Sequence, residues 1–352
     1  MRIRGHLVVA TLLLLASVGW GCGSNGADDP EPGSAGAQTS APADEVSVAA
    51  AGDLGMKAPG IATLEAMAAA EPDLYLALGD LSYAGPDSAD EYCDAVHAAL
   101  GPTAPFQLLA GNHEEDSGED GPIAEFAECL PDRAGSVGEY ARQYYFDVGG
   151  LARFILISPD LTIEGRHYYY GPADGGSDTP ELAWLKDAIA GARADGIPWV
   201  IVGMHKNCIS LGEYYCDVYQ DLFTTLIEER VDLVLSGHDH SYQRSKQLSA
   251  PAPGCREVVV DDYDPDCVAT AGGTYRQGAG SAFVIAGAGG AGLYELNPDD
   301  PEAGYFEATM GRETRGARPG FALLEISEER LGVRFVGSRP GSFDDAFQIT
   351  SR

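Results

Sequence analysis

A repeated pattern constrains this chain more than any other feature: five apolar runs each lead into residues that can bind a metal ion. The run Leu76–Leu78 leads into Gly79 and Asp80. It is continuous rather than alternating, which is typical of a strand covered on both faces. The other runs, with the polar residues that follow them, are Val46–Ala51 with Asp53, Phe106–Ala110 with Asn112, Trp199–Gly203 with His205, and Val231–Ser236 with His238 and His240.

These five strand ends indicate a shared site. A single Gly-Asp pair after a strand is usually a turn. Five strands that are each followed by Asp, Asn or His are difficult to attribute to turns. In α/β proteins, chemistry gathers at the carboxyl ends of strands. Helical patterns lie between the runs, over residues 59–70, 88–100 and 221–229, and another begins at Pro180 with Thr179 as its N-cap. The alternation predicts a largely parallel sheet.

The later part of the chain predicts strands and turns. Residues 144–148 and 152–158, separated by two glycines, predict a hairpin. Residues 321–326 and 331–336 predict a closing hairpin that extends a second sheet. Gly287–Gly292 matches G-x-G-x-x-G after a strand, but no amphipathic helix follows it. We therefore predict a tight turn beside the metal loops rather than a nucleotide site.

The ordered motifs GDLG, GDLSY, GNHE, a histidine after an apolar strand, and GHDH resemble those of the calcineurin-like metallophosphoesterases. Within them, the spacing of Tyr83 after Asp80 is most similar to the purple acid phosphatases. The resemblance covers about residues 46–340. It implies an α/β fold of two packed mixed β-sheets flanked by helices, in four αββα layers, with a catalytic domain over residues 46–345.

The resemblance also implies a pair of metal ions that share Asp80 as a bridging ligand. Asp53, Tyr83 and His240 would complete one site, and Asn112, His205 and His238 the other. A tyrosine ligand binds as phenolate, which favours a strongly acidic cation such as iron(III). The expected partner is divalent iron, zinc or manganese.

Two further histidines are candidates for substrate contacts. In the resembling family, the residue at the position of His113 faces substrate with Asn112, and a protonated imidazole there could donate to the leaving group. His167 matches no motif, but it lies in a segment that could form a loop over the site. Lys206 departs from the family pattern, so we expect different substrate contacts after His205. Asp239 and Gln243 are two further departures from that pattern.

The resemblance implies an exported hydrolase of phosphate monoesters, with a metal-bound hydroxide as nucleophile. Two alternatives stay open: a phosphodiesterase of the same superfamily, and a metal-dependent binding protein without catalysis. The formal net charge of −32 argues against nucleic acid and anionic membrane surfaces as partners. A small phosphate ester would have to be attracted locally, by metal ions. The sequence does not indicate an oligomeric state.

Residues 1–22 are typical of an export signal, with arginines before a short apolar run. Small residues before Cys22 resemble a bacterial lipoprotein cleavage site, which would make Cys22 lipidated and anchor the protein to the envelope membrane. Ordinary secretion is the alternative. Residues 23–45 are rich in Gly, Ser, Ala, Pro and the acidic residues Asp and Glu. This composition predicts a flexible tether.

The remaining six cysteines predict disulfides in an exported chain, although six cysteines allow 15 connectivities. Close spacing favours Cys208 with Cys216 and Cys255 with Cys267, which leaves Cys93 with Cys129. No C-x-x-C spacing occurs, which argues against a structural zinc site.

Overall fold

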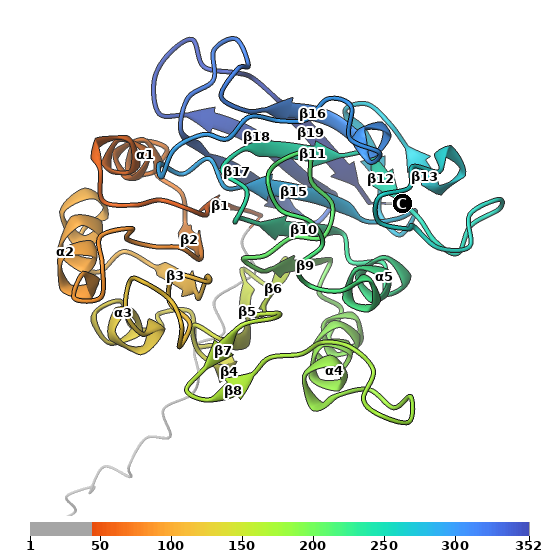
Figure 1. Cartoon of the computed structure of the whole chain (residues 1–352), viewed down its shortest axis with the longest axis horizontal. Helices are drawn as coiled ribbons and strands as arrows, with labels where there is room; N and C mark the ends of the chain where they lie inside the picture. The colour runs from red at the N-terminus through yellow and green to blue at the C-terminus, as the bar shows by residue number, and fades with distance from the viewer. Residues whose placement is uncertain (1–43, 352) are drawn as a thin grey trace, which may run out of the picture. The chain divides into compact units, whose positions relative to one another are not determined.

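The computed structural model describes residues 44–351. The predicted export signal, the lipidation of Cys22 and nearly all of the tether lie outside these residues. Two large β-sheets form the centre of the described chain, and helices cover them (Figure 1). Among the described residues, no helix is both long enough and apolar enough to span a bilayer.

The first sheet has the strand order β14-β19-β18-β17-β1-β2-β3. Its strands are β1 (Glu45–Ala51), β2 (Leu74–Leu78), β3 (Phe106–Leu109), β14 (Thr274–Arg276), β17 (Gly320–Ser327), β18 (Arg330–Gly337) and β19 (Ala346–Thr350). β1, β2 and β3 are parallel, whereas β17 pairs antiparallel with β1. β19 lies beyond residue 345, where the catalytic domain was expected to end.

The second sheet has the order β16-β11-β15-β10-β9-β6-β5-β4. Its strands are β4 (Val137–Glu139), β5 (Gln143–Val148), β6 (Ala152–Leu156), β9 (Trp199–Gly203), β10 (Leu233–Ser236), β11 (Tyr242–Ser245), β15 (Ala282–Ala286) and β16 (Phe306–Met310). β6, β9, β10 and β15 are parallel, and β5 and β11 pair antiparallel with their neighbours. Both sheets are therefore mixed, which confirms the predicted fold class.

The metal-binding strand ends divide between the two sheets, and each sheet is parallel where it carries them. The sheet assignment of one predicted feature was wrong. The closing hairpin β17–β18 was expected to extend a second sheet, yet it joins β1, β2 and β3. The apolar pattern sets which faces of a strand are buried, but it does not set which strand lies beside it.

The helices cover the outer faces of the sheets. Figure 1 shows α1, α2 and α3 beside the first sheet and α4 and α5 beside the second. They are α1 (Ala58–Ala69), α2 (Ala89–Leu100), α3 (Ile123–Cys129), α4 (Pro180–Ala194) and α5 (Gln220–Glu228). The Thr179 hydroxyl accepts the Leu182 N–H at 3.3 Å, so the predicted N-cap of α4 is confirmed.

The short elements are β7 (Thr162–Ile163) with β8 (Arg166–His167), β12 (Gln247–Leu248) with β13 (Val268–Thr270), and the 3₁₀ turns Pro265–Cys267 and Ala303–Tyr305.

Alternating side chains of the central strands enter two cores. In β2, Leu74, Leu76 and Leu78 pack between the two sheets, whereas Tyr75 and Ala77 pack beneath the helices. Both sets are buried, which explains why the run is continuously apolar. Trp199 of β9 also donates its indole N–H to the Ser327 carbonyl at 2.6 Å, which ties the two sheets together.

Three disulfides are present: Cys93–Cys129, Cys208–Cys216 and Cys255–Cys267. The last two are the pairs that close spacing favoured, and the first is the pair that they left. The first joins α2 to α3, and the other two close short loops next to the second sheet. A cross-link of this kind stabilises the fold mainly by restricting the unfolded chain.

A buried ion pair connects the two sheets through β11 and the residue before β19, each the second strand of its sheet. Arg244 of β11 binds Asp345, just before β19, through two hydrogen bonds of 2.8 Å each. The side chains of Arg244 and Asp345 are only 5% and 8% exposed. Tyr242 also donates its hydroxyl to Asp345 at 2.9 Å. Removing one partner of such a pair leaves an uncompensated buried charge.

We therefore expect Asp345→Ala to lower the free energy of unfolding by about 3–5 kcal/mol. Denaturant unfolding at neutral pH measures this change. Glu295→Ala is the matched control, because it removes a carboxylate from the exposed Arg312–Glu295 pair. Equal stability of the two variants would contradict a structural role for the buried pair.

Candidate metal centre

The predicted metal ligands lie on loops at the carboxyl ends of strands in both sheets. Four of them follow β1, β2 and β3 of the first sheet, and three follow β9 and β10 of the second. In chain order they are Asp53, Asp80, Tyr83, Asn112, His205, His238 and His240. The site is therefore formed where the two sheets meet, and neither sheet holds all of the ligand types.

Several of these residues have left-handed backbone conformations. The φ angles are 58° for Asp53, 51° for Asp80, 50° for Tyr83 and 70° for His238. Positive φ is uncommon for residues other than glycine, and such strain concentrates at functional sites. These four residues follow β1, β2 and β10, so the chain reverses sharply at the carboxyl ends of these three strands.

The Tyr83 hydroxyl lies at the centre of the first group of donors. It is 2.9 Å from Asp53 Oδ1, 2.9 Å from Asp80 Oδ2 and 2.8 Å from His240 Nε2. Burial and the two carboxylates raise the pKa of the Tyr83 phenol well above its usual value. A bound cation would have to displace this proton before the oxygen could act as a phenolate ligand.

A second group of donors faces the other oxygen of Asp80. His205 Nε2 is 3.2 Å from Asp80 Oδ1 and 3.1 Å from Asn112 Oδ1. Asp80, His205 and His238 each offer one ligand atom, and these atoms lie within 4.8 Å of one another. Asp80 thus presents Oδ2 to the first group and Oδ1 to the second, as a carboxylate that bridges two cations does.

The charges of the site fit bound cations. Asp53 is fully buried, and Asp80 is 2% exposed. Within residues 44–351, the ion pairs of both carboxylates are with histidines, and none is with lysine or arginine. His205 and His113 lower the pKa of Asp80 despite its burial. Buried carboxylates need compensation of this kind, and a donor set of carboxylate, amide and imidazole suits divalent or trivalent metals.

Glycines leave the room that the ligands occupy. A Cβ on Gly111 would overlap Asp80 Oδ1, and a Cβ on Gly237 would lie 2.7 Å from Asp53 Oδ2. Gly79 has φ 85°, and a Cβ there would lie 2.6 Å from His205 Nδ1. The predicted turn Gly287–Gly292 packs on the same loops, since Gly289 donates to the Gly52 carbonyl and Ala291 to that of Asp53.

Glu114 is a further residue of the site, and its role was not predicted from the sequence. Its buried carboxylate accepts the backbone N–H groups of Asp80, Leu81 and Gly111 at 3.0, 2.7 and 2.9 Å. Burial and the nearby Asp80 raise the pKa of Glu114. It holds the loop after β2 against the loop after β3. Its place in the GNHE motif was the signal that could have identified it.

His113 lies beside the donor groups and is 22% exposed. Its Nδ1 is 3.2 Å from Asp120 Oδ2, and its Nε2 is 3.8 Å from Asp80 Oδ2. Asp120, assisted by Asp80, raises the pKa of His113 to about 9. Asp120 also accepts the Tyr83 N–H at 2.6 Å, so it positions a candidate ligand and His113 together. No sequence motif pointed to Asp120.

His167 is half-exposed on β8, and its contacts do not include the predicted metal ligands. Its Nε2 is 3.2 Å from Asp160 Oδ1. Asp160 also binds Lys206, which directly follows His205, at 3.1 Å. A substrate role for His167 stays a prediction.

Comparison with known proteins gives a consistent result. A family model described as calcineurin-like phosphoesterase matches residues 46–242. Purple acid phosphatase 21 from Arabidopsis thaliana is 29% identical over 214 residues, covering 58% of this chain and 46% of the relative. Purple acid phosphatase 22 from the same plant is 30% identical over 217 residues, with the same coverage of 58% and 46%. The chain thus spans about half the length of these curated relatives.

Solved structures show the same fold. Purple acid phosphatase PPD1 from yellow lupin superposes with a TM-score of 0.62 at 19% identity, over 87% of this chain and 54% of that one. GAP50 from Plasmodium superposes with a TM-score of 0.52 at 14% identity, over 88% of this chain and 90% of that one. At these identities the likeness concerns the fold alone.

The close approach of Gly111 to Asp80 provides a test of Asp80 as a metal ligand. Gly111→Ala would force Asp80 Oδ1 away from its position, so we expect the folded variant to retain less metal than the wild type. Metal analysis after purification without chelators, with thermal unfolding as a folding check, measures this. Gly273→Ala is the control, because the nearest atom to its new Cβ would be the Ala346 carbonyl oxygen at 3.7 Å. Equal metal content in both variants would contradict the assignment of Asp80.

Proposed function

The chain belongs to the calcineurin-like phosphoesterase family, and we propose that it hydrolyses phosphate monoesters at a centre of two metal ions. The observation that carries this proposal is the contact of the Tyr83 hydroxyl with Asp53, Asp80 and His240. A phenol among these donors supports iron(III) on that side. The donor set around Asp80 Oδ1 supports divalent iron, zinc or manganese on the other.

In this proposal Asp80 would be shared by both cations. Asp53, Tyr83 and His240 would hold the first cation, and Asn112, His205 and His238 would hold the second. When bound, the metal pair supplies an acidified water and positive charge for the phosphoryl oxygens. Glu114 holds the loop that carries Asp80 against the loop that carries Asn112, through its three hydrogen bonds to backbone N–H groups.

His113 is the proposed proton donor. Asp120 faces its Nδ1, which leaves Nε2 directed toward Asp80 and the centre. The raised pKa keeps the imidazole protonated at neutral pH. Nε2–H can therefore donate to the leaving oxygen of the ester as the P–O bond breaks. Asp120 orients the ring and stabilises its positive charge.

We further propose that residues 46–345, together with β19, are the catalytic domain of an exported protein. Three disulfides support an oxidising location, since such bonds are rare in the cytosol. The lipid anchor at Cys22 belongs to the same proposal. Mass spectrometry of the native amino terminus tests it directly.

The role of Tyr83 predicts a colour. A phenolate bound to iron(III) absorbs visible light by charge transfer, so Tyr83→Phe should abolish this band in the oxidised protein. Asp80→Ala should instead lose both metals, because it removes the ligand that they share. Visible absorption and metal analysis of the two variants separate these roles. A colourless, fully active wild type with only zinc or manganese would contradict a ferric site at Tyr83.

The role of His113 predicts lost turnover without lost metal. His113→Ala should lower kcat on an aryl phosphate monoester by about 10²–10⁴-fold, since it removes the proton donor. Its metal content should equal that of the wild type. His97→Ala, on α2, is the control and should keep full activity. A normal kcat in His113→Ala would sink the assignment, and higher activity of the wild type on aryl diesters would favour a phosphodiesterase.

A further inference from the structure

The three histidines of the centre share one arrangement, in which one ring nitrogen faces the donor groups and the other is held from outside. His205 directs Nε2 toward Asp80, and its Nδ1 is 2.7 Å from the Leu78 carbonyl oxygen. His240 directs Nε2 toward Tyr83 and forms a further hydrogen bond to the backbone of Gly292. Outer partners of this kind fix the tautomer and the ring orientation of a ligand.

For His238 the outer partner is a carboxylate. Its Nε2 is 3.2 Å from Asp217 Oδ2, so Nδ1 is the nitrogen left for the donor group that includes Asp80 and His205. The Tyr214 ring stacks on the same imidazole, with the centroids 3.8 Å apart and the planes inclined by 21°. One contact holds the edge of the His238 ring, and the other covers its face.

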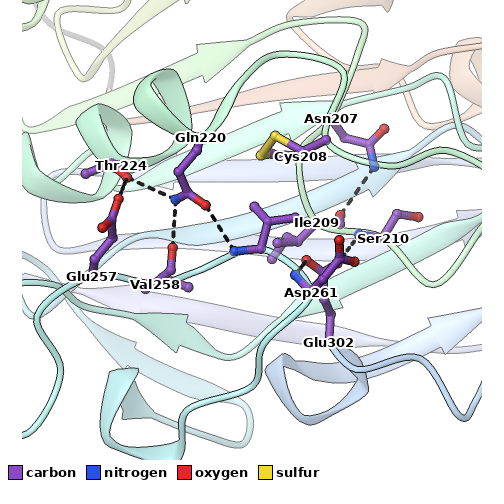
Figure 2. Close-up of a disulfide and its surroundings, with 12 residues drawn as sticks. Asn207, Cys208, Ile209, Ser210, Gln220, Thr224, Glu257, Val258, Asp261 and Glu302 are labelled. Atoms are coloured by element: carbon purple, nitrogen blue, oxygen red, sulfur yellow. Dashed lines mark hydrogen bonds between the residues drawn. A yellow bond between two sulfur atoms is a disulfide. The ribbon is translucent and has the colours of Figure 1, made fainter.

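Both contacts come from one loop, residues 207–217, which the Cys208–Cys216 disulfide closes. The Asp217 N–H donates to the Asn207 carbonyl at 3.3 Å, across the base of this loop. Figure 2 shows the disulfide beside Ser210 and Glu302, and Glu302 accepts the Ser210 N–H at 3.0 Å. The loop is therefore anchored to the body of the protein away from His238 as well.

Two residues that depart from the family pattern fasten this loop. Asp239, between the two metal-site histidines, is fully buried and accepts the Glu213 N–H at 2.8 Å. Gln243 accepts the Leu211 N–H at 2.8 Å and donates to the Ser210 hydroxyl at 2.8 Å. A Cβ on Gly212 would overlap Asp239 Oδ1, so the loop packs directly against this carboxylate.

We propose that Asp217 is the positioning residue of His238, and that Asp239 and Gln243 act by fastening the loop that carries it. This inference rests on the proposed dinuclear centre. An Asp217 carboxylate that accepts Nε2–H holds His238 in the tautomer whose Nδ1 lone pair is free for a metal, and it makes that nitrogen more basic. The stacked Tyr214 ring keeps the imidazole from turning away.

If the Asp217–His238 pair served only stability, its removal would change unfolding and not metal binding. The Asp217 side chain is 36% exposed, and exposed pairs contribute little to stability. Asp217→Ala should therefore unfold like the wild type while binding metal more weakly. Glu213→Ala is the matched control, because it removes the same charge from the same loop, and Glu213 contributes only its backbone N–H to Asp239.

The experiment titrates metal-free protein with Zn²⁺ in competition with a chelator. We expect wild type and Glu213→Ala to bind two zinc ions alike, and Asp217→Ala to bind one of them about 10–100-fold more weakly. Equal affinities in all three proteins, or an equal loss in both variants, would overturn the inference while leaving the proposed function intact. A wild type that binds no metal would overturn both.

Nitrogen-15 spectra of the imidazoles provide a second readout, independent of affinity. In zinc-loaded wild type, His238 should show a protonated Nε2 and a metal-bound Nδ1. In Asp217→Ala the slowly exchanging Nε2–H signal should be lost, whereas the Nδ1–H signal of His205, which faces the Leu78 carbonyl, should persist. Identical His238 signals in both proteins would rule out positioning by Asp217.

Discussion

The burial of two carboxylates at the junction of two sheets is the constraint on which the centre depends. Asp53 and Asp80 are shielded from water, and in the described structure their charged partners are histidines rather than lysine or arginine. Burying charge in this way is costly unless cations or hydrogen bonds compensate for it. Backbone N–H groups supply part of the compensation, since His113 donates to Asp80 and His238 to Asp53. Metal ions would supply the rest.

The packing of the two sheets places the donors around this pair of charges. Each sheet is parallel where it contributes ligands, so the carboxyl ends of β1 to β3 and of β9 and β10 lie at the same edge. Glycines next to the ligands allow the loops to approach closely, as at Gly111 and Gly237. Stability and site geometry are linked here, because residues such as Glu114 join two ligand loops through buried hydrogen bonds.

The loop after β9, residues 207–217, contacts the predicted ligand His238 from outside. Asp239 lies between two predicted ligands, yet its carboxylate points to the disulfide-closed loop and not to the other donors. This explains why an acidic residue can stand at that position without adding a further charge to the centre. The loop then returns Tyr214 and Asp217 to His238, so a segment remote from β10 in sequence completes the surroundings of its histidine.

The sequence by itself determined the residue types of the site and the strands that carry them. Continuous apolar runs followed by Asp, Asn and His indicated buried strands with ligands at their ends, and these signals are local. Local cues also located the α4 cap and the β5–β6 hairpin, although the short helix α3 was not predicted. Only the tertiary structure decided that the runs divide between two sheets, that Glu114 clamps two loops, and that Asp120 and Asp217 face His113 and His238. Those contacts depend on how distant segments pack, and apolar periodicity does not encode which segments become neighbours.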